Sequence, residues 1–303
     1  EGFSQRTCPT CGSSRVQGRA VRSEPQAESV AVTELRDYWR GFRSRNIFFS
    51  FRRCDGCGLL YSPQYFTPST LQTLYVAMGD NTAGERRETL EKTHAAYLCM
   101  LQRFAPVQGR WLEVGADIGL FAGGLASLPE VESVDAVEPN LAVHDELRDA
   151  IGGAGTIFSS VEDVERRYSG IVGIHVLDHL LDPRGYLSFL NTILDDDGTM
   201  MFVVHSEASM LRYLMGRRWP PFCLQHPQLF CPDSLVELLD RAGFEVVSIR
   251  RTRNHFSFDQ LLGVALKVFG LRYSSHALLR RIVAPLPLGN IAVIARKTSE
   301  VQQ

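Results

Sequence analysis

The chain has 303 residues, of which 45% are hydrophobic, and its formal net charge at pH 7 is −2. This length is enough for one large domain with a smaller one beside it. Because the charge is nearly balanced, no global positive field attracts nucleic acid, and we do not expect such a partner. No apolar run reaches the roughly 18 residues of a membrane-spanning helix, and no secretory signal is evident. We therefore expect a cytoplasmic protein.

Residues 1–62 contain two cysteine pairs with the same spacing, Cys8-Pro-Thr-Cys11-Gly and Cys54-Asp-Gly-Cys57-Gly. Each pair places two thiolates about one turn apart, so that four sulfurs can form a closed tetrahedral site for Zn²⁺. A closed site leaves no position for substrate, and the metal is therefore expected to be structural. A redox role would need a thioredoxin-like unit, which the sequence lacks. The other three cysteines are expected to be small buried apolar residues: Cys99, Cys223 and Cys231.

Two helical segments are expected before residue 106. The first, residues 29–42, lies between the cysteine pairs and accounts for their wide separation. The second belongs to residues 63–105, which we expect to form a helical linker or lid. In "ERRETLEKTHAAYLCMLQRF" one face recurs at helical spacing and comprises Leu90, His94, Tyr97, Leu98, Leu101 and Phe104.

From residue 106 to residue 303, expected strands alternate with expected helices. The strand segments are "RWLEVGA", "VESVDAVEP", "GTIFSS", "GIVGIHVL", "GTMMFVVHS", "FEVVSIRR" and "NIAVIARK". This alternation predicts a mainly parallel sheet covered by helices on both faces. Residues 206–232 are irregular and are expected to form a substrate lid, followed by a helix with Asp233 or Ser234 near its N-cap. The apolar insert 258–288 could cap a substrate, form a dimer interface or touch a membrane, but packing inside the fold is the expectation.

The segment "RWLEVGADIGLF", residues 110–121, predicts a strand that turns into a helix over a nucleotide. Asp117 occupies the second glycine position of the dinucleotide fingerprint and would repel a pyrophosphate, and no Lys-Ser/Thr pair of a phosphate-binding loop follows. Glu113 and Asp117 suit a cationic ligand instead. Glu138 ends the next strand and can accept hydrogen bonds from both hydroxyls of a ribose. A ribose with a cationic, phosphate-free group indicates S-adenosylmethionine (SAM).

With these segments the chain resembles the class I SAM-dependent methyltransferases. "LEVGADIGLF" resembles their first motif, "VDAVEPN" their ribose-binding acid, "GIVGIHVLDHLLDP" their fourth-strand motif and "LDDDGTMMFVVHSE" their fifth strand. The resemblance covers roughly residues 106–300. It implies an α/β fold with a doubly wound, Rossmann-like sheet of seven strands, in which the last strand, "NIAVIARK", is antiparallel. The small zinc-binding domain would precede this fold.

The resemblance also implies which residues bind the cofactor. They are Glu113, Gly115, Asp117, Gly119, Phe121, Glu138, Ser160, Val161 and His175. One segment departs from the family pattern, because the Asp that usually meets the adenine amino group is absent from "FSSVEDV". Ser160 or Glu162 would have to make that contact.

A zinc ribbon ahead of a methyltransferase resembles two groups of enzymes. One comprises sugar C-methyltransferases and related small-molecule enzymes, and the other comprises ribosomal RNA methyltransferases. Residues 1–60 carry ten Arg and six acidic residues, which is a modest excess, and the rest of the chain has no basic stripe. We therefore expect a small-molecule methyl acceptor, a sugar nucleotide or a natural-product intermediate, methylated on carbon or oxygen. An rRNA or tRNA methyltransferase and a non-catalytic methyltransferase-like binding protein are the alternatives. The expected assembly is a monomer or a homodimer.

Histidines are the candidate bases, because proton removal at neutral pH favours imidazole. His175, Asp178 and His179 follow the fourth strand, at the sheet edge where open α/β sheets bind ligands. In ubiquinone-pathway O-methyltransferases the corresponding E-x-x-E-H segment can hold a divalent cation, but here His175 replaces its first Glu. A hydrogen-bonded structural pair is the main expectation, and a second metal is the alternative.

The expected lid contains the other candidate base, His226. Its surroundings resemble a segment of the small-molecule branch, through Ser209, Gly216, Trp219, His226 and Phe230. In the sugar C-methyltransferases the corresponding histidine acts as the base or supports it. The alternative is a histidine that only ties the lid to the sheet. The resemblance also implies lid tyrosines at Tyr65 and Tyr75, although each residue alone is more typical of core packing. The expected catalytic residues are therefore His226, His179, Asp178 and Tyr75.

Overall fold

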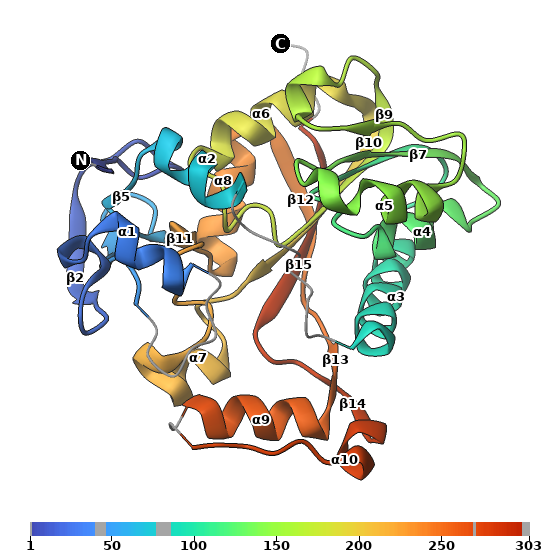
Figure 1. The fold of residues 1–303 in the computed structure, drawn as a ribbon. Helices are drawn as coiled ribbons and strands as arrows, with labels where there is room; N and C mark the ends of the chain where they lie inside the picture. Colours follow the sequence, from blue (N-terminus) through green and yellow to red (C-terminus); the bar gives the residue numbers. More distant parts are fainter. Residues whose placement is uncertain (1, 40–46, 77–85, 269–270, 299–303) are drawn as a thin grey trace.

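The computed structural model describes residues 2–39, 47–76, 86–268 and 271–298. A seven-stranded sheet forms its centre (Figure 1), in the order β12 (Phe244–Arg251), β15 (Asn290–Lys297), β10 (Leu194–His205), β9 (Tyr168–Ile174), β6 (Gly109–Val114), β7 (Val131–Val137) and β8 (Ile157–Phe158). The strand pairs from β10 to β8 are parallel, whereas β15 is antiparallel to both β10 and β12. The predicted doubly wound sheet with an antiparallel last strand is confirmed.

Helices cover both faces of this sheet. One face carries α3 (Arg87–Phe104), α4 (Leu120–Ala126) and α5 (His144–Ile151), and the other carries α6 (Pro183–Ile193) and α8 (Pro232–Arg241). Strand side chains alternate between the two apolar cores, as the pleat requires. In β10, Met200 and Phe202 belong to the core under α6 and α8, while Met201 and Val203 belong to the core under α3, α4 and α5. Burial on both faces explains why the strand reads as a continuous apolar run.

The N-terminal region forms a second, smaller sheet. Its order is β11 (Gln228–Leu229), β4 (Leu60–Tyr61), β3 (Phe51–Cys54) and β2 (Val16–Val21), all antiparallel. A separate ribbon pairs β1 (Phe3–Gln5) with β5 (Gln64–Phe66). Strand β11 comes from the expected substrate lid. The cysteine-bearing region and the lid therefore share one sheet, although more than 160 residues separate them in sequence.

Short helices complete the N-terminal region. The helix expected at residues 29–42 is broken into η1 (Ala27–Ser29), α1 (Val32–Leu35) and η2 (Arg36–Tyr38), and residues 40–42 lie outside the described part. In the expected linker, α2 (Pro68–Val76) precedes α3, and residues 77–85 lie outside the described part. An aromatic core of Trp39, Phe49, Tyr65 and Phe66 fixes these segments against the lid residue Leu224.

The expectation that the insert 258–288 packs inside the fold is wrong. Its described part consists of α9 (Phe258–Val268) and α10 (Ala277–Arg281), held by a hairpin of β13 (Asn254–Ser257) and β14 (Val283–Leu286). Phe258 and Leu278 are 47% and 78% exposed. The hairpin is anchored to α3 by the backbone N–H of His255, which donates to Thr93 Oγ1 at 2.8 Å. Because this anchor lies at the edge of the molecule, the helices project away from both cores (Figure 1).

The expectation that Cys99 and Cys231 are buried is wrong, since Cys231 is half-buried. Cys99 is exposed on α3, because it lies on the face of that helix turned away from the core. As expected, Asp233 and Ser234 lie near the N-cap of α8, which is Cys231, because Pro232 is the first helical residue. The remaining lid elements are α7 (Met210–Met215) and η5 (Gly216–Arg218).

Among the described residues, no helix combines the length and the apolarity required to cross a membrane.

Candidate active site

The loop between β6 and α4 needs its glycines for both conformation and space. Gly115 and Gly119 have φ angles of +68° and +76°, in the left-handed region that favours glycine. A Cβ on Gly115 would lie 2.6 Å from Val176 Cγ2, so the neighbouring strand end leaves no room for a side chain. Asp117 adopts φ +48° between the two glycines. A non-glycine residue in this region is uncommon, and such strain gathers at ligand sites.

Glu138 directly follows β7 and lies beside this loop. Its Oε2 accepts a hydrogen bond from the backbone N–H of Asp117, and its Oε1 accepts one from Asn140, both at 2.8 Å. The side chain is 9% exposed, so these bonds fix one rotamer. Each carboxylate oxygen has a second lone pair, which is the acceptor that a ribose hydroxyl requires. The site residues therefore fit a ribose at this position.

Glu113 lies below the loop and is fully buried. Burial raises the pKa of its carboxyl well above the usual range, and the nearby charges of Asp117 and Glu138 raise it further. Its Oε2 is buried, and no described group donates to it. Without a ligand, the neutral acid is therefore favoured at Glu113. A cation close to that oxygen would favour the carboxylate, since an opposite charge offsets desolvation.

The residues expected near adenine already have partners within the protein. Ser160 precedes η4 (Val161–Asp163), and its hydroxyl donates to the carboxylate of Glu162. The two alternatives for the adenine contact are thus bonded to each other. Val161 is buried in the core under α6 and α8, and Phe121 is buried in the core under α3, α4 and α5. Their part in cofactor binding stays a prediction.

Four histidines converge at the carboxyl ends of β9 and β10. The rings of His175 and His205 stack with centroids 4.3 Å apart, and His226 lies 5.0 Å from His205. His179 is 4.7 Å from His226 on its other side. The sequence does not predict His205 as a site residue, because its segment indicates only a strand. Its position as the last residue of β10, at the edge where such sheets bind ligands, was the available signal.

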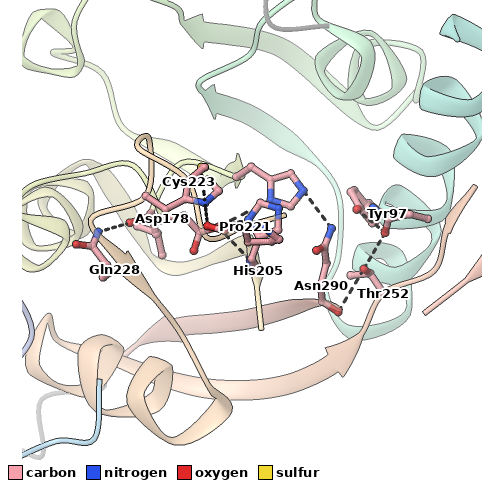
Figure 2. A network of polar contacts seen from close by, with 12 residues as sticks. Tyr97, Asp178, His205, Pro221, Cys223, Gln228, Thr252 and Asn290 are labelled. Atoms are coloured by element: carbon pink, nitrogen blue, oxygen red, sulfur yellow. Dashed lines mark hydrogen bonds and ion pairs between the residues drawn. The ribbon is translucent and has the colours of Figure 1, made fainter. Parts of the chain in front are cut away.

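Asp178 lies close to two of these rings, 2.8 Å from Nδ1 of His205 (Figure 2) and 4.0 Å from Nδ1 of His175. Its Oδ2 accepts a hydrogen bond from the backbone N–H of His205 at 3.0 Å and lies 2.8 Å from Nδ1 of the same residue. Burial opposes a charged Asp178, but His175 and His205 outweigh it and hold the pKa of this carboxyl below its usual range. Burial lowers the pKa of His205 to about 4, so its imidazole is neutral at pH 7. The bond therefore fixes a proton on Nδ1 and leaves Nε2 as the acceptor.

The grouping around Asp178 differs from the expected one. Ligand atoms of His175, Asp178 and His205 all lie within 4.8 Å of one another, an arrangement that could hold a metal ion. His179, expected in that group, is instead half-buried beside Tyr75, whose hydroxyl lies 3.3 Å from its Nδ1. Strand β10 pairs with β9, and its carboxyl end therefore places His205 beside His175 and Asp178. His205 thus takes the third place in this group, which the sequence had suggested for His179.

His226 has two partners on one ring nitrogen. Its Nδ1 is 2.7 Å from the carbonyl oxygen of Pro221 and 3.4 Å from Cys223 Sγ. Burial lowers the pKa of His226, but the thiolate form of Cys223 outweighs it and raises that pKa to about 9. Burial raises the pKa of the Cys223 thiol, and the charge of His226 reverses this to a net lowering. Cys223 is buried as expected, but its role is polar as well as apolar.

The two predicted tyrosines have different environments. Tyr75 packs edge-on against Trp39, with ring centroids 5.1 Å apart, and burial raises the pKa of its hydroxyl. It therefore reaches the histidine cluster as a neutral hydroxyl, through His179. Tyr65 donates to the carbonyl oxygen of Leu224 and so ties the lid to the N-terminal region.

Asn290, at the start of β15, is a further residue that the sequence did not indicate. Its Nδ2 lies 3.2 Å from His175 Nε2, and its carbonyl oxygen accepts a bond from the backbone N–H of Thr252 at 3.0 Å (Figure 2). His175 itself has φ +55°. The antiparallel last strand thus fixes the orientation of the first residue after β9.

The four predicted cysteines come together in the N-terminal region. Sulfur pairs Cys8–Cys57 and Cys11–Cys54 are each 3.4 Å apart, and all four sulfurs lie within 4.8 Å of one another. Both turns have the same form, because Gly12 N–H donates to Cys8 at 2.9 Å and the glycine after Cys57 donates to Cys54 at 3.1 Å. Four convergent sulfurs from two matched turns form the donor set that tetrahedral Zn²⁺ prefers.

Comparison with known proteins agrees with this geometry. A family model described as a methyltransferase domain matches residues 86–249, which is more than half of the chain. The order of the central sheet, with its antiparallel last strand, is that of the class I SAM-dependent methyltransferases. The chain belongs to the methyltransferase domain family.

Two curated relatives are ubiquinone biosynthesis O-methyltransferases. The protein of Cereibacter sphaeroides (strain KD131 / KCTC 12085) is 26% identical over 155 residues, which cover 47% of this chain and 63% of that protein. The protein of Ruegeria sp. (strain TM1040) is 27% identical over 175 residues, or 54% and 69% of the two chains. The chain thus spans less than two thirds of the length of the first relative.

A solved structure shares the fold. It is a chain from the complex between the Haloferax volcanii Trm112 methyltransferase activator and a methyltransferase. The TM-score is 0.53 at 11% identity, and the match covers 72% of this chain and 96% of that chain. At this identity the likeness concerns the fold alone.

Proposed function

We propose that this chain is a SAM-dependent methyltransferase that acts on a small molecule. The observation that supports it is the meeting of two groups at one edge of the sheet. The glycine loop with Glu138 follows β6 and β7, and the histidine cluster follows β9 and β10. Parallel strands open onto a common crevice at their carboxyl ends. A cofactor on the first group and an acceptor on the second would therefore be neighbours.

In this proposal Glu138 holds the ribose through the lone pairs that its backbone bonds leave free. The cationic end of the ligand lies near Asp117 and the unpaired oxygen of Glu113. Ser160 or Glu162 meets the adenine. SAM supplies an already activated methyl group, so the protein has to align the acceptor, exclude water and remove a proton.

His226 is proposed as the base. Because Pro221 and Cys223 occupy Nδ1, the proton acceptor on this ring is Nε2. When Nε2 takes a proton from the acceptor, the resulting imidazolium is stabilised by the thiolate of Cys223 through Nδ1–H. Asp178 orients His205 in the same cluster, while Tyr75 contacts His179 on another side of it. The names of the two curated relatives favour oxygen as the acceptor atom.

The four-cysteine cluster is proposed to hold one structural Zn²⁺. Its second turn follows β3, which pairs with β4, and β4 pairs with β11. Strand β11 begins at Gln228, two residues after His226. A metal at this cluster would thus hold the sheet on which the position of the proposed base depends, without touching substrate.

The test is an untargeted labelling experiment. The full chain is incubated with SAM labelled on its methyl group and with pools of metabolites or of RNA, and the labelled product is isolated. A labelled small molecule supports the proposal, and a labelled RNA supports the alternative enzyme class. Absence of both SAM binding and product would make the chain a non-catalytic binding protein.

A further inference from the structure

A cavity of about 300 Å³ has three arginines in its wall. It lies between the N-terminal sheet and the lid. Arg19 comes from β2, Arg53 from β3 and Arg212 from α7. No described residue that lines the cavity is acidic. Three guanidinium groups in one small concavity stand out in a chain whose overall charge is −2.

Only one of the three charges is neutralised. Arg53 forms a forked pair with Glu207, at 2.9 Å and 3.2 Å, and also donates to the carbonyl oxygen of Gly58 at 2.7 Å. Among the described residues, neither Arg19 nor Arg212 forms an ion pair. The group of three arginines and one carboxylate therefore keeps a net charge of about +2 at pH 7, because Arg always stays protonated.

Arg212 is held in place without a counter-ion. Its guanidinium lies over the ring of Phe222, 4.5 Å from the centroid, which restricts its motion. Its Nε is buried, and no described group accepts that proton. Burial lowers the pKa of Arg212, and the neighbouring Arg53 acts in the same direction while Glu207 opposes it. An anion bound here would satisfy the unpaired donor and offset the desolvation of the charge.

The backbone of β2 contributes to the hollow. The pairing of β2 with β3 shifts register between Gln17 and Val21. Gly18, within this irregular stretch, has φ +68°, which glycine adopts readily. A bulge of this kind bends a strand and redirects its side chains. It brings Arg19 to the cavity in which Arg53 and Arg212 lie.

The cavity is connected to the proposed active site along the chain. Glu207, the partner of Arg53, follows the last residue of β10, His205, by two positions. The backbone N–H of Glu207 donates to Phe230 at 2.8 Å, in the segment that also carries His226. A ligand that spans both places would present one end to the histidines and an anionic end to the arginines.

We propose that Arg19, Arg53 and Arg212 form a subsite for the phosphoryl groups of the methyl acceptor, which would be a nucleotide-linked compound. Planar guanidinium groups match phosphate oxygens in forked pairs, and a net charge of about +2 fits a diphosphate better than a single carboxylate. The inference rests on the proposed methyltransferase function and adds the substrate class to it. Through Arg19 and Arg53, the N-terminal sheet would then take a direct part in substrate binding.

The test measures binding of inorganic pyrophosphate, UDP, ADP and GDP to the full chain by calorimetry, at low and high salt. Arg19→Ala and Arg212→Ala should each weaken the best-bound diphosphate roughly tenfold or more, as loss of a charge-assisted hydrogen bond does. Arg22→Ala is the matched control, because Arg22 is exposed just beyond the end of β2 and does not line the cavity. It should change the affinity by less than about twofold.

Further variants and ligands separate the outcomes. Arg212→Lys keeps the charge but removes the fork, so weakened binding in this variant supports guanidinium recognition even if Arg212→Ala unfolds. Equal affinity of the wild type, Arg19→Ala and Arg212→Lys for every diphosphate would overturn the proposal. Tighter arginine-dependent binding of a single-stranded RNA would also overturn it. SAM binding is measured in the same samples. If the wild type does not bind SAM, the proposed function is contradicted. If it binds SAM but no diphosphate, only the proposed subsite is contradicted.

Discussion

The carboxylate of Glu138 and the backbone N–H of Asp117 are joined by a hydrogen bond of 2.8 Å, which links the end of β7 to the loop after β6. The bond crosses from one strand end to the next and holds a non-glycine residue at φ +48°. The ribose acceptor and the strained loop are therefore one unit. A change at Glu138 acts on both.

We predict that Glu138→Ala weakens SAM binding. Loss of a hydrogen bond to a charged group removes about 1.5–3 kcal/mol, so two ribose bonds together correspond to at least a hundredfold loss of affinity. Calorimetry with SAM and S-adenosylhomocysteine measures it. Glu138→Gln retains the shape of the side chain and should lose less. Glu132→Ala, an exposed acid on the same strand, serves as the control, and equal affinity of Glu138→Ala and this control would remove Glu138 from the site.

We predict that His226→Ala lowers turnover by about 10²–10⁴, the usual contribution of positioned acid–base catalysis. Its affinity for SAM should stay close to that of the wild type, because the base faces the acceptor. His179→Ala removes a half-buried ring that contacts Tyr75 and should reduce stability and cofactor binding as well. His276→Ala, on the exposed insert, is the control. Full turnover of His226→Ala with the methylated substrate would contradict the assignment.

The pair of Cys223 and His226 predicts a pH dependence. The base acts when neutral, and the pKa of His226 is raised to about 9, so kcat/KM should rise as the pH increases toward about 9. In Cys223→Ala the thiolate that raises the pKa of His226 is lost, although Asp178 and Pro221 still raise it, so the rising limb of the pH profile should move to lower pH. Cys223→Ser, which has the same size but no thiolate at these pH values, should behave like Cys223→Ala. A limb that stays in place in both variants would show that the thiol does not act on His226.

We predict one tightly bound zinc per chain, lost in Cys54→Ser together with much thermal stability, because ligand binding and folding of such a site are coupled. Elemental analysis and thermal unfolding measure both. Cys99→Ser changes an exposed cysteine outside the cluster and should leave zinc and stability unchanged. Zinc retained by Cys54→Ser would contradict the prediction for the cysteine cluster. A second equivalent that survives Cys54→Ser but is lost in His205→Ala would instead lie at His175, Asp178 and His205.

The sequence by itself determined the features that depend on neighbouring residues. The alternation of apolar strands and amphipathic helices predicted the parallel sheet, because each strand is buried on both faces and each helix on one. The glycine loop and Glu138 were found because a strand, a turn and the next strand end suffice to build them. The two cysteine turns were found for the same reason, since each is complete within a few residues.

Only the tertiary structure decided which distant side chains meet. His205 joins His175 because β10 pairs with β9, and no local pattern encodes which strands are neighbours. Cys223 reads as an apolar residue in sequence, and its polar role arises only when the lid folds back on His226. The insert reads as core material for the same reason. Hydrophobic periodicity states that a face is apolar, whereas exposure depends on whether the fold places another surface against it.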